Sequence, residues 1–345
     1  MDKFYSMQDY FLQLFDENKR QFGFFGNTKN ELISWQKNTR IKLSEILGLD
    51  KMKKSELDSK IIEEQNFNGY TRRKVVIQTQ NKVFMPMFIL TPTGEKNNIP
   101  VIALHGHASD GKNGLVGITN ELTKDKINSF NYTYGLDLVK RGYTVFCPDL
   151  CGSGERRERK QQDDKFILQS SCNDLNNASL SLGISLLGIM IFDLIRLIDY
   201  IEELGFDKNV ACCGFSGGGL CTLWLSAIDE RIKCSVVSGY FHGFRDTILE
   251  NNLCGCNFVY NVWRYIDTCD LGSLIAPRKL LVESGKDDKL NGNRGLDNVF
   301  EQVLETKKSY DLFQSENLSH TIFDEGHKWY GSAYNFLDDW RNELE

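Results

Sequence analysis

The sequence predicts an α/β fold with a mostly parallel central sheet, helices on both faces and a helical appendage at the N-terminus. After Pro100, short continuous apolar runs alternate with segments whose apolar residues recur at helical spacing. Such runs are typical of parallel strands buried on both faces, and the intervening helices then cover both sides of the sheet. A serine between glycines joins one run to a helical segment. The runs span residues 101–104, 144–147, 210–213, 235–237 and 279–282.

The first 68 residues are predicted to form the helical appendage, and residues 69–345 the main domain. The appendage is rich in charged and amide side chains, and its apolar residues cluster at helical spacing, which indicates two or three helices and no sheet. These helices could limit access to a pocket or could cover apolar surface away from it, and the sequence favours neither. The clusters contain Phe11, Leu12, Leu14 and Phe15, and Ile41, Leu43, Ile46 and Leu47.

From Arg72 onward the apolar pattern changes to that of strands. Residues 74–79 and 83–90 are predicted to pair as a hairpin. Helical spacing returns in residues 189–204, and residues 310–313 are interpreted as a further strand. Stretches enriched in glycine, asparagine and serine are interpreted as surface loops, and they cover residues 106–135 and 170–185.

Length and composition are those of an ordinary globular chain. The 345 residues are 41% hydrophobic and 26% charged, and the net charge of -6 gives no reason to expect nucleic acid or an anionic membrane as a partner. The longest apolar stretch, residues 180–192, is too short to span a bilayer. Ten cysteines without a signal-peptide pattern favour reduced thiols and a cytoplasmic location. A homo-oligomer is compatible with all of this.

The glycine-flanked serine stands in Gly214-Phe215-Ser216-Gly217-Gly218. A serine on so sharp a turn lies close to both neighbouring backbones, where side chains two positions away would collide, and glycine removes them. The turn exposes the hydroxyl beside a helix N-terminus, whose free N–H groups stabilise negative charge. Ser216 is therefore the predicted nucleophile, although a motif this short also occurs as a plain glycine-rich turn.

A serine nucleophile needs a base, and the base needs an acid that orients it. Sheets with this kind of turn supply them in the chain order serine, acid, histidine, and the acid is expected on a loop just beyond a strand. The apolar run at 279–282 is followed by Gly285 and then by Asp287 and Asp288. Either aspartate fits this position.

The base is expected after the next strand. His327 follows Gly326, which allows a tight turn, whereas His320 has no glycine beside it. We therefore predict that His327 is the base. A histidine or aspartate considered alone would more often be a solvated surface group, and the order of the three elements is what favours a catalytic role.

Two backbone N–H groups are expected to bind the oxyanion that forms when the serine attacks a carbonyl. One belongs to Gly217, directly after the nucleophile. The other is assigned to His107, in the loop after the run at 101–104, through its backbone and not its ring.

No metal or organic cofactor is expected. His105 and His107, with Asp110 nearby, suggest a metal site only weakly. Cys254-Gly255-Cys256 also suggests zinc, but no second ligand pair follows at zinc-finger spacing. Its thiols are therefore expected to be core or loop residues.

Taken together, these motifs resemble the α/β-hydrolase superfamily, and within it the acetylxylan-esterase-like and dienelactone-hydrolase-like branch. The resemblance extends from about residue 70 to the C-terminus. The chain departs from the family pattern at Cys151, where arginine is common, and at Leu290-Asn291-Gly292, where proline often follows the acid. The matching segments are residues 105–107, 141–145, 148–156, 214–218, 227–233, 254–256, 274–278 and 326–329.

The resemblance implies a serine hydrolase with Ser216 as nucleophile, Asp288 as acid and His327 as base. Its substrates would be small-molecule esters with small acyl groups, acetylated sugars among them, and residues 69–345 would be the catalytic domain. A serine peptidase of prolyl-oligopeptidase type is an alternative, although about 70 helical residues cannot form the propeller of such proteins. A catalytically inactive hydrolase fold that serves as a binding module is another.

Overall fold

One sheet organises the molecule. The structure is a computed structural model that describes residues 5–94, 99–206, 208–251 and 253–344. Within these ranges the strands form a nine-stranded sheet in the order β1-β2-β3-β5-β4-β6-β7-β8-β9. The pairs from β1 to β5 are antiparallel, and the pairs from β5 through β4 to β9 are parallel. The strands are β1 Lys60–Phe67, β2 Tyr70–Gln80, β3 Val83–Pro92, β4 Pro100–Leu104, β5 Thr144–Pro148, β6 Val210–Phe215, β7 Ile232–Ser238, β8 Lys279–Gly285 and β9 Leu318–Phe323.

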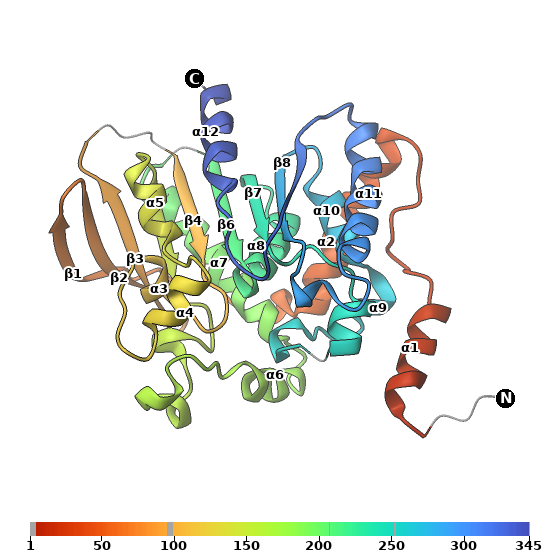
Figure 1. Ribbon diagram of the computed structural model, residues 1–345, viewed down its shortest axis with the longest axis horizontal. Helices are drawn as coiled ribbons and strands as arrows, with labels where there is room; N and C mark the ends of the chain where they lie inside the picture. Colours follow the sequence, from red (N-terminus) through yellow and green to blue (C-terminus); the bar gives the residue numbers. More distant parts are fainter. Residues whose placement is uncertain (1–4, 95–98, 207, 252, 345) are drawn as a thin grey trace.

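Helices cover both faces of this sheet, which confirms the predicted fold class (Figure 1). Helices α2, α7, α8 and α10 contribute to the hydrophobic core on one face, and α5 and α12 to the core on the other. None of the described helices is both long and apolar enough to cross a membrane. The helices are α1 Met7–Glu17, α2 Lys29–Leu47, α3 Lys112–Leu115, α4 Lys124–Ser129, α5 Tyr134–Lys140, α6 Cys172–Leu180, α7 Leu186–Glu203, α8 Gly217–Ile228, α9 Val262–Tyr265, α10 Thr268–Ile275, α11 Leu296–Leu312 and α12 Ala333–Leu344.

The central strands are apolar at every position because both of their faces are buried. In β6, Cys212 belongs to the core on the α8 face, and the adjacent Cys213 belongs to the core on the α12 face. Side chains alternate between the faces of a strand, so a continuous apolar run serves both cores. Both thiols are fully buried, as expected for cysteines that act as small core residues.

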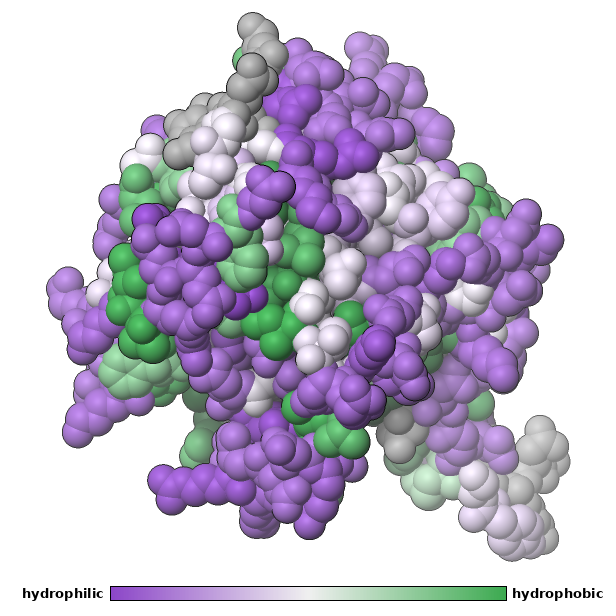
Figure 2. All heavy atoms as spheres, turned by 60° about the vertical axis from the view of Figure 1, so that its left-hand side comes forward, coloured by the Kyte–Doolittle hydropathy of each residue, from purple (hydrophilic) through white to green (hydrophobic). Residues whose placement is uncertain are grey.

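Hydrophilic residues cover most of the face shown in Figure 2, with smaller hydrophobic areas between them.

Strand β1, Lys60–Phe67, lies within the segment that we predicted to be entirely helical, so that part of the prediction was wrong. Every side chain of β1 is exposed, and the strand pairs with β2 through its backbone at the edge of the sheet. An exposed edge strand needs no alternation of apolar and polar residues, and the sequence therefore carried no strand pattern there. The domain boundary at residue 68 stays a prediction.

Helix α2 packs at the far end of α8 from Ser216. Its Gln36 side chain donates to the carbonyl oxygen of Ala276 at 2.7 Å, and Arg40 donates to that of Ala227 at 2.9 Å. Ala227 lies near the end of α8, eleven residues after Ser216, which corresponds to about 16 Å along a helix. Residues 36–40 of α2 therefore cover surface away from the predicted site, and a gating role for the appendage stays a prediction. Its start is fixed by a capping box between Thr28 and Glu31.

The strand that precedes His327 is β9, and not residues 310–313 as predicted. Those residues belong to the end of α11 and the turn after it. The buried face of α11 includes several polar side chains, which hid its helical period in the sequence. The buried residues of α11 are Asn298, Val299, Gln302, Thr306, Ser309 and Tyr310, and Val299 is the one aliphatic side chain among them. Residues 172–180, predicted as part of a loop, likewise form α6.

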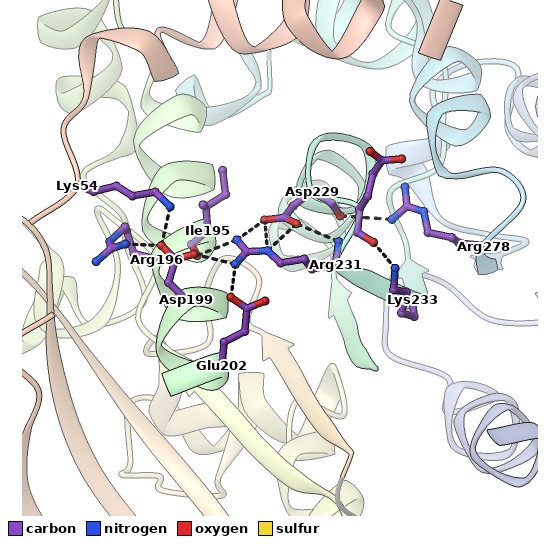
Figure 3. A network of polar contacts seen from close by, with 10 residues as sticks. Lys54, Ile195, Arg196, Asp199, Glu202, Asp229, Arg231, Lys233 and Arg278 are labelled. Carbon is purple, nitrogen blue, oxygen red and sulfur yellow. Dashed lines mark hydrogen bonds and ion pairs between the residues drawn. The ribbon is translucent and has the colours of Figure 1, made fainter. Parts of the chain in front are cut away.

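A charged network joins α7, the turn after α8 and the start of β7 (Figure 3). The Arg231 guanidinium contacts Asp229 at 2.6 Å, Asp199 at 2.8 Å and Glu202 at 2.9 Å. Lys54, from the segment after α2, contacts the second oxygen of Asp199 at 2.8 Å. The network holds the end of α8 opposite Ser216 against its neighbours, which fixes how α8 lies on the sheet.

Candidate active site

Ser216 lies on the turn between β6 and α8, with φ of 58° and ψ of -119°. A side chain in this conformation is strained, and the surrounding backbone must hold it there. A Cβ on Gly214 would overlap the carbonyl oxygen of Gly218, and a Cβ on Gly218 would overlap that of Leu104. The neighbouring backbones approach so closely that both positions require glycine. This is the steric reason for which the sequence predicted glycines on either side of Ser216.

The loop after β4 lies against the start of α8. A Cβ on Gly106 would lie 2.6 Å from the carbonyl oxygen of Phe215, and one on Gly217 would lie 2.9 Å from His107 Nδ1. The hydroxyl of Tyr132 donates to the carbonyl oxygen of His107 at 2.5 Å and anchors the loop. The two residues predicted to supply oxyanion donors, His107 and Gly217, are therefore neighbours.

A buried ion pair holds the loops that follow β4 and β5. Lys112 Nζ lies 2.7 Å from Asp149 Oδ2, and these side chains are 1% and 0% exposed. Asp149 also accepts the N–H of Lys112 at 2.8 Å and the N–H of Glu155 at 3.1 Å. Removing one partner would leave a buried charge unpaired, which is strongly destabilising. This pair gives a structural reason for the motif at residues 148–156.

A hydrogen bond joins Asp288 to His327. The distance between Asp288 Oδ2 and His327 Nδ1 is 2.6 Å, and Asp288 is 4% exposed. The other carboxylate oxygen accepts the N–H of Leu290 at 2.8 Å. With Nδ1–H donating to the carboxylate, Nε2 is the nitrogen that can accept a proton. The side chain of Asp287, the other aspartate of this loop, is exposed, and its N–H donates to the carbonyl oxygen of Glu325 at 3.1 Å.

The His327 ring packs beside the residue that precedes the nucleophile. Its centroid is 4.4 Å from that of Phe215. Gly239, with φ of 62°, leaves room for the ring, because a Cβ there would lie 3.2 Å from His327 Cε1. Among the hydrogen bonds of the described residues, none joins Ser216 to His327. Catalytic hydrogen bonds of this kind commonly tighten when substrate binds.

Two of the other histidines are held by structural contacts. His105 Nε2 accepts the N–H of Leu150 at 3.0 Å, and its Nδ1 faces the carbonyl oxygen of Gly106 at 3.0 Å. Both ring nitrogens of His105 are thus occupied, which argues against a metal site built on it. His320 lies within β9 and its Nε2 contacts Ser284 Oγ at 3.1 Å. Burial lowers the pKa of His320 to about 4.

Three cysteines surround the outer ring nitrogen of His107. Its Nε2 lies 3.6 Å from Cys256 Sγ and 3.9 Å from Cys172 Sγ, and Cys254 completes a group whose ligand atoms all lie within 4.8 Å of one another. Burial opposes a charge on the His107 ring, but hydrogen bonds with Cys172 and Cys254 outweigh it and raise the pKa of His107 to about 10. The sequence suggested metal ligands at His107 and at Cys254 and Cys256 only separately and weakly, since the spacing of these residues gave no sign that they meet.

The family is decided by a match along most of the chain. The sequence profile of the Abhydrolase family matches residues 2–299. The chain belongs to the Abhydrolase family. One relative of this chain is the candidate hydrolase YtaP of Bacillus subtilis (strain 168). It is 25% identical over 229 residues, which cover 63% of this chain and 70% of YtaP.

Solved structures of esterases share the fold of this Abhydrolase family chain. A candidate acetyl xylan esterase from Bacteroides fragilis NCTC 9343 superimposes with a TM-score of 0.77 at 17% identity, over 93% of this chain and 82% of that one. A glucuronoyl esterase from Solibacter usitatus superimposes with a TM-score of 0.62 at 14% identity, over 90% of this chain and 92% of that one. Acetyl xylan esterase 1 from Thermoanaerobacterium sp. JW/SL YS485 superimposes with a TM-score of 0.58 at 16% identity, over 96% of this chain and 98% of that one. The family match confirms the predicted resemblance to the α/β-hydrolase superfamily, and these esterase structures share its fold.

Proposed function

We propose that this chain is a serine esterase that hydrolyses small acyl esters, with Ser216, His327 and Asp288 as its catalytic residues. The observation that carries the proposal is the 2.6 Å hydrogen bond from His327 Nδ1 to Asp288 Oδ2, on the loops beside the strained turn of Ser216. A buried carboxylate in this position orients the imidazole and stabilises its cation. The imidazole can then take the proton of the serine hydroxyl.

The proposed reaction has two halves. Ser216 Oγ attacks the ester carbonyl carbon while His327 Nε2 takes its proton, and the carbonyl electron pair moves to oxygen. The N–H groups of Gly217 and His107 stabilise this oxyanion. The intermediate collapses, the bond to the alcohol oxygen breaks, and the imidazolium proton passes to the leaving alcohol. Water then attacks the acyl-enzyme with the same proton transfers, which releases the acid and restores Ser216.

The space beside the oxyanion loop supports a small acyl group. A cavity of about 10 Å³ borders Gly106, His107 and Gly217, and Leu150 and Leu220 are among its other walls. A space of this size holds about one water-sized group, which suits an acetyl methyl better than a long chain. The structural neighbours named acetyl xylan esterases point in the same direction, and so we propose acetyl esters, including those of sugars, as substrates.

No observation favours a peptidase of prolyl-oligopeptidase type. The described residues ahead of β2 form α1, α2, the 3₁₀ helix η1, Leu49–Lys51, and β1, and these elements do not build a propeller.

The first test replaces the nucleophile. Ser216→Ala should retain the fold and lower kcat for p-nitrophenyl acetate by several orders of magnitude, since the covalent route is lost. Ser226→Ala is the matched control, because Ser226 is a buried serine of α8 whose hydroxyl contacts that of Ser235, at 2.8 Å, and lies away from the predicted site. A fluorophosphonate probe should label the parent and the control but not Ser216→Ala. Activity of Ser216→Ala within about tenfold of the parent would contradict the proposal. A parent chain that is neither labelled nor active would favour the binding module.

The second test concerns the acyl group. We expect kcat/KM to fall steeply across p-nitrophenyl acetate, butyrate and octanoate, because longer chains do not fit the cavity beside Gly217. Release of acetate from acetylated xylo-oligosaccharides, measured in parallel, tests the sugar substrate. Octanoate hydrolysed as efficiently as acetate would rule out the small-acyl preference while leaving the esterase assignment intact.

A further inference from the structure

We propose that His107, Cys172, Cys254 and Cys256 bind one zinc ion in a structural site beside the oxyanion loop. The proposal does not depend on the esterase assignment, because the proposed proton transfers and oxyanion contacts use none of these four side chains, although Cys172 and Cys256 also border the cavity beside Gly217. It also departs from our expectation that the chain holds no metal.

The distances between the ligand atoms match those around tetrahedral zinc. With Zn–S of about 2.3 Å and Zn–N of about 2.1 Å, a tetrahedron places sulfur about 3.6 Å from nitrogen, and two sulfurs about 3.8 Å apart. His107 Nε2 lies 3.6 Å from Cys256 Sγ and 3.9 Å from Cys172 Sγ. All four ligand atoms, including Cys254 Sγ, lie within 4.8 Å of one another. An ion at their centre would need only small side-chain adjustments.

The ligand set selects the kind of metal. Three thiolates and one imidazole form a Cys₃His set, which is a common structural zinc site, and thiolates disfavour the hard cations Mg²⁺ and Ca²⁺. Four protein ligands leave no open position for water or substrate, so the ion would be structural and not catalytic. The set comes from three separate parts of the fold: the loop after β4, the start of α6 and the 3₁₀ helix η6, Gly255–Asn257, with the residue before it.

A disulfide explains the same cysteines less well. A disulfide would join two of the three sulfurs. It would not explain why the third thiol and the imidazole of His107 lie in the same group. The four side chains instead converge on one point, which is the arrangement that a single metal ion requires.

The consequence for the fold is a clamp on the loop that carries His107. The ion would tie the His107 ring to α6 and η6, which also contact each other through the N–H of Gly255 and Asn173 Oδ1 at 2.7 Å. His107 Nδ1 faces Gly217, so fixing the ring also fixes the loop against the start of α8. Metal ions that join distant segments add their binding free energy to folding.

The first experiment measures metal content. The full chain, without a histidine tag, is purified under reducing conditions, desalted, and analysed by inductively coupled plasma mass spectrometry. We expect about one zinc per chain in the parent. In Cys172→Ser, Cys254→Ser and Cys256→Ser the zinc affinity should fall at least about 100-fold, since loss of outer-shell partners alone costs 10–100-fold. Cys151→Ser is the matched control, a partly buried thiol near the cluster but outside it, and it should keep the metal.

The second experiment does not require a folded variant. The parent, stripped with a chelator under reducing conditions, is titrated with Co²⁺ and followed by its thiolate-to-cobalt charge-transfer absorption. We expect saturation at one equivalent, displacement by Zn²⁺, and a higher Tm with Zn²⁺ than with chelator. A parent chain that contains no zinc and gives no charge-transfer band with Co²⁺ would overturn the proposal. So would a disulfide between two of these cysteines in reductant-free protein whose reduced form binds no metal.

Discussion

The carboxylate of Asp288 uses its two oxygens for two different contacts. One oxygen holds the loop through the N–H of Leu290, and the other accepts from the His327 ring. Asparagine has almost the same size, but its NH₂ group can only donate, so it cannot replace both acceptors. It also lacks the charge that stabilises an imidazolium. The roles of Asp288 and its neighbour Asp287 can therefore be separated by conservative substitutions.

We expect Asp288→Asn to lower kcat for p-nitrophenyl acetate on the order of a thousandfold or more, with a much smaller change in KM. Asp287→Asn is the control, because its side chain is exposed, and it should stay within about threefold of the parent. Steady-state kinetics on both variants measures this difference. An equal loss in the two variants, or full activity in Asp288→Asn, would contradict the assignment of the acid.

At the scale of elements, the turn between α8 and β7 is held by Arg231. Its planar guanidinium has five N–H donors, and it contacts carboxylates of the turn itself and of α7 (Figure 3). The group is partly buried and its contacts form a network, so it contributes more than an isolated surface ion pair. This gives a physical reason for the charged residues in the motif at 227–233.

Arg231→Ala should lower the free energy of unfolding by about 1–2 kcal/mol, because three carboxylates lose an arginine contact at once, although Asp199 keeps its contact with Lys54. Lys233→Ala is the control two residues further on, in β7, since Lys233 is partly buried and its Nζ donates to the carbonyl oxygen of Glu230, at 2.8 Å, and not to the network. Its effect should stay within about 0.5 kcal/mol. Urea denaturation of both variants measures the difference. Indistinguishable midpoints would show that the network does not stabilise the turn.

How far the sequence predicted the structure depended on what each element buries. The central strands were predictable because two buried faces leave a continuous apolar run, as in β6. Strand β1 and the end of α11 were not, because the first exposes every side chain and the second buries polar residues. The glycines of the nucleophile turn were predictable from sterics alone. The group around His107 was not, because Cys256 lies 149 residues away in sequence and only the fold brings them together.

For the whole molecule, buried histidines make stability depend on pH. His242 is 1% exposed, and burial lowers its pKa from 6.5 to about 4, although Asp288 attracts its cation. His320 behaves in the same way. In the unfolded chain both take up a proton near pH 6.5, whereas the folded chain resists this down to about pH 4. Their contribution to stability is therefore full above pH 6.5 and is lost as the pH falls towards 4.

We expect the free energy of unfolding to decline between about pH 6.5 and pH 4, by about 1.4 kcal/mol per pH unit for each histidine that titrates. His242→Gln removes one such group, so the slope of its free energy of unfolding against pH should be smaller by up to about 1.4 kcal/mol per pH unit. This difference in slope does not depend on how stable the variant is. Urea denaturation at a series of pH values gives both slopes. Parallel declines for the parent and His242→Gln would show that His242 does not titrate in this window.

The position of β9 has a consequence for when the molecule can begin to work. β9 is the last of the described strands and forms the edge of the sheet beside β8, and His327 follows it. A ribosome that has released the chain only as far as the loop after β8 has already delivered Ser216 and Asp288, but not His327. Domains emerge from their N-terminal side during translation. Under the proposed mechanism, the nascent polypeptide is therefore inert until the segment that carries β9 and His327 docks, and a protease that removes this segment would abolish activity while leaving Ser216 in place.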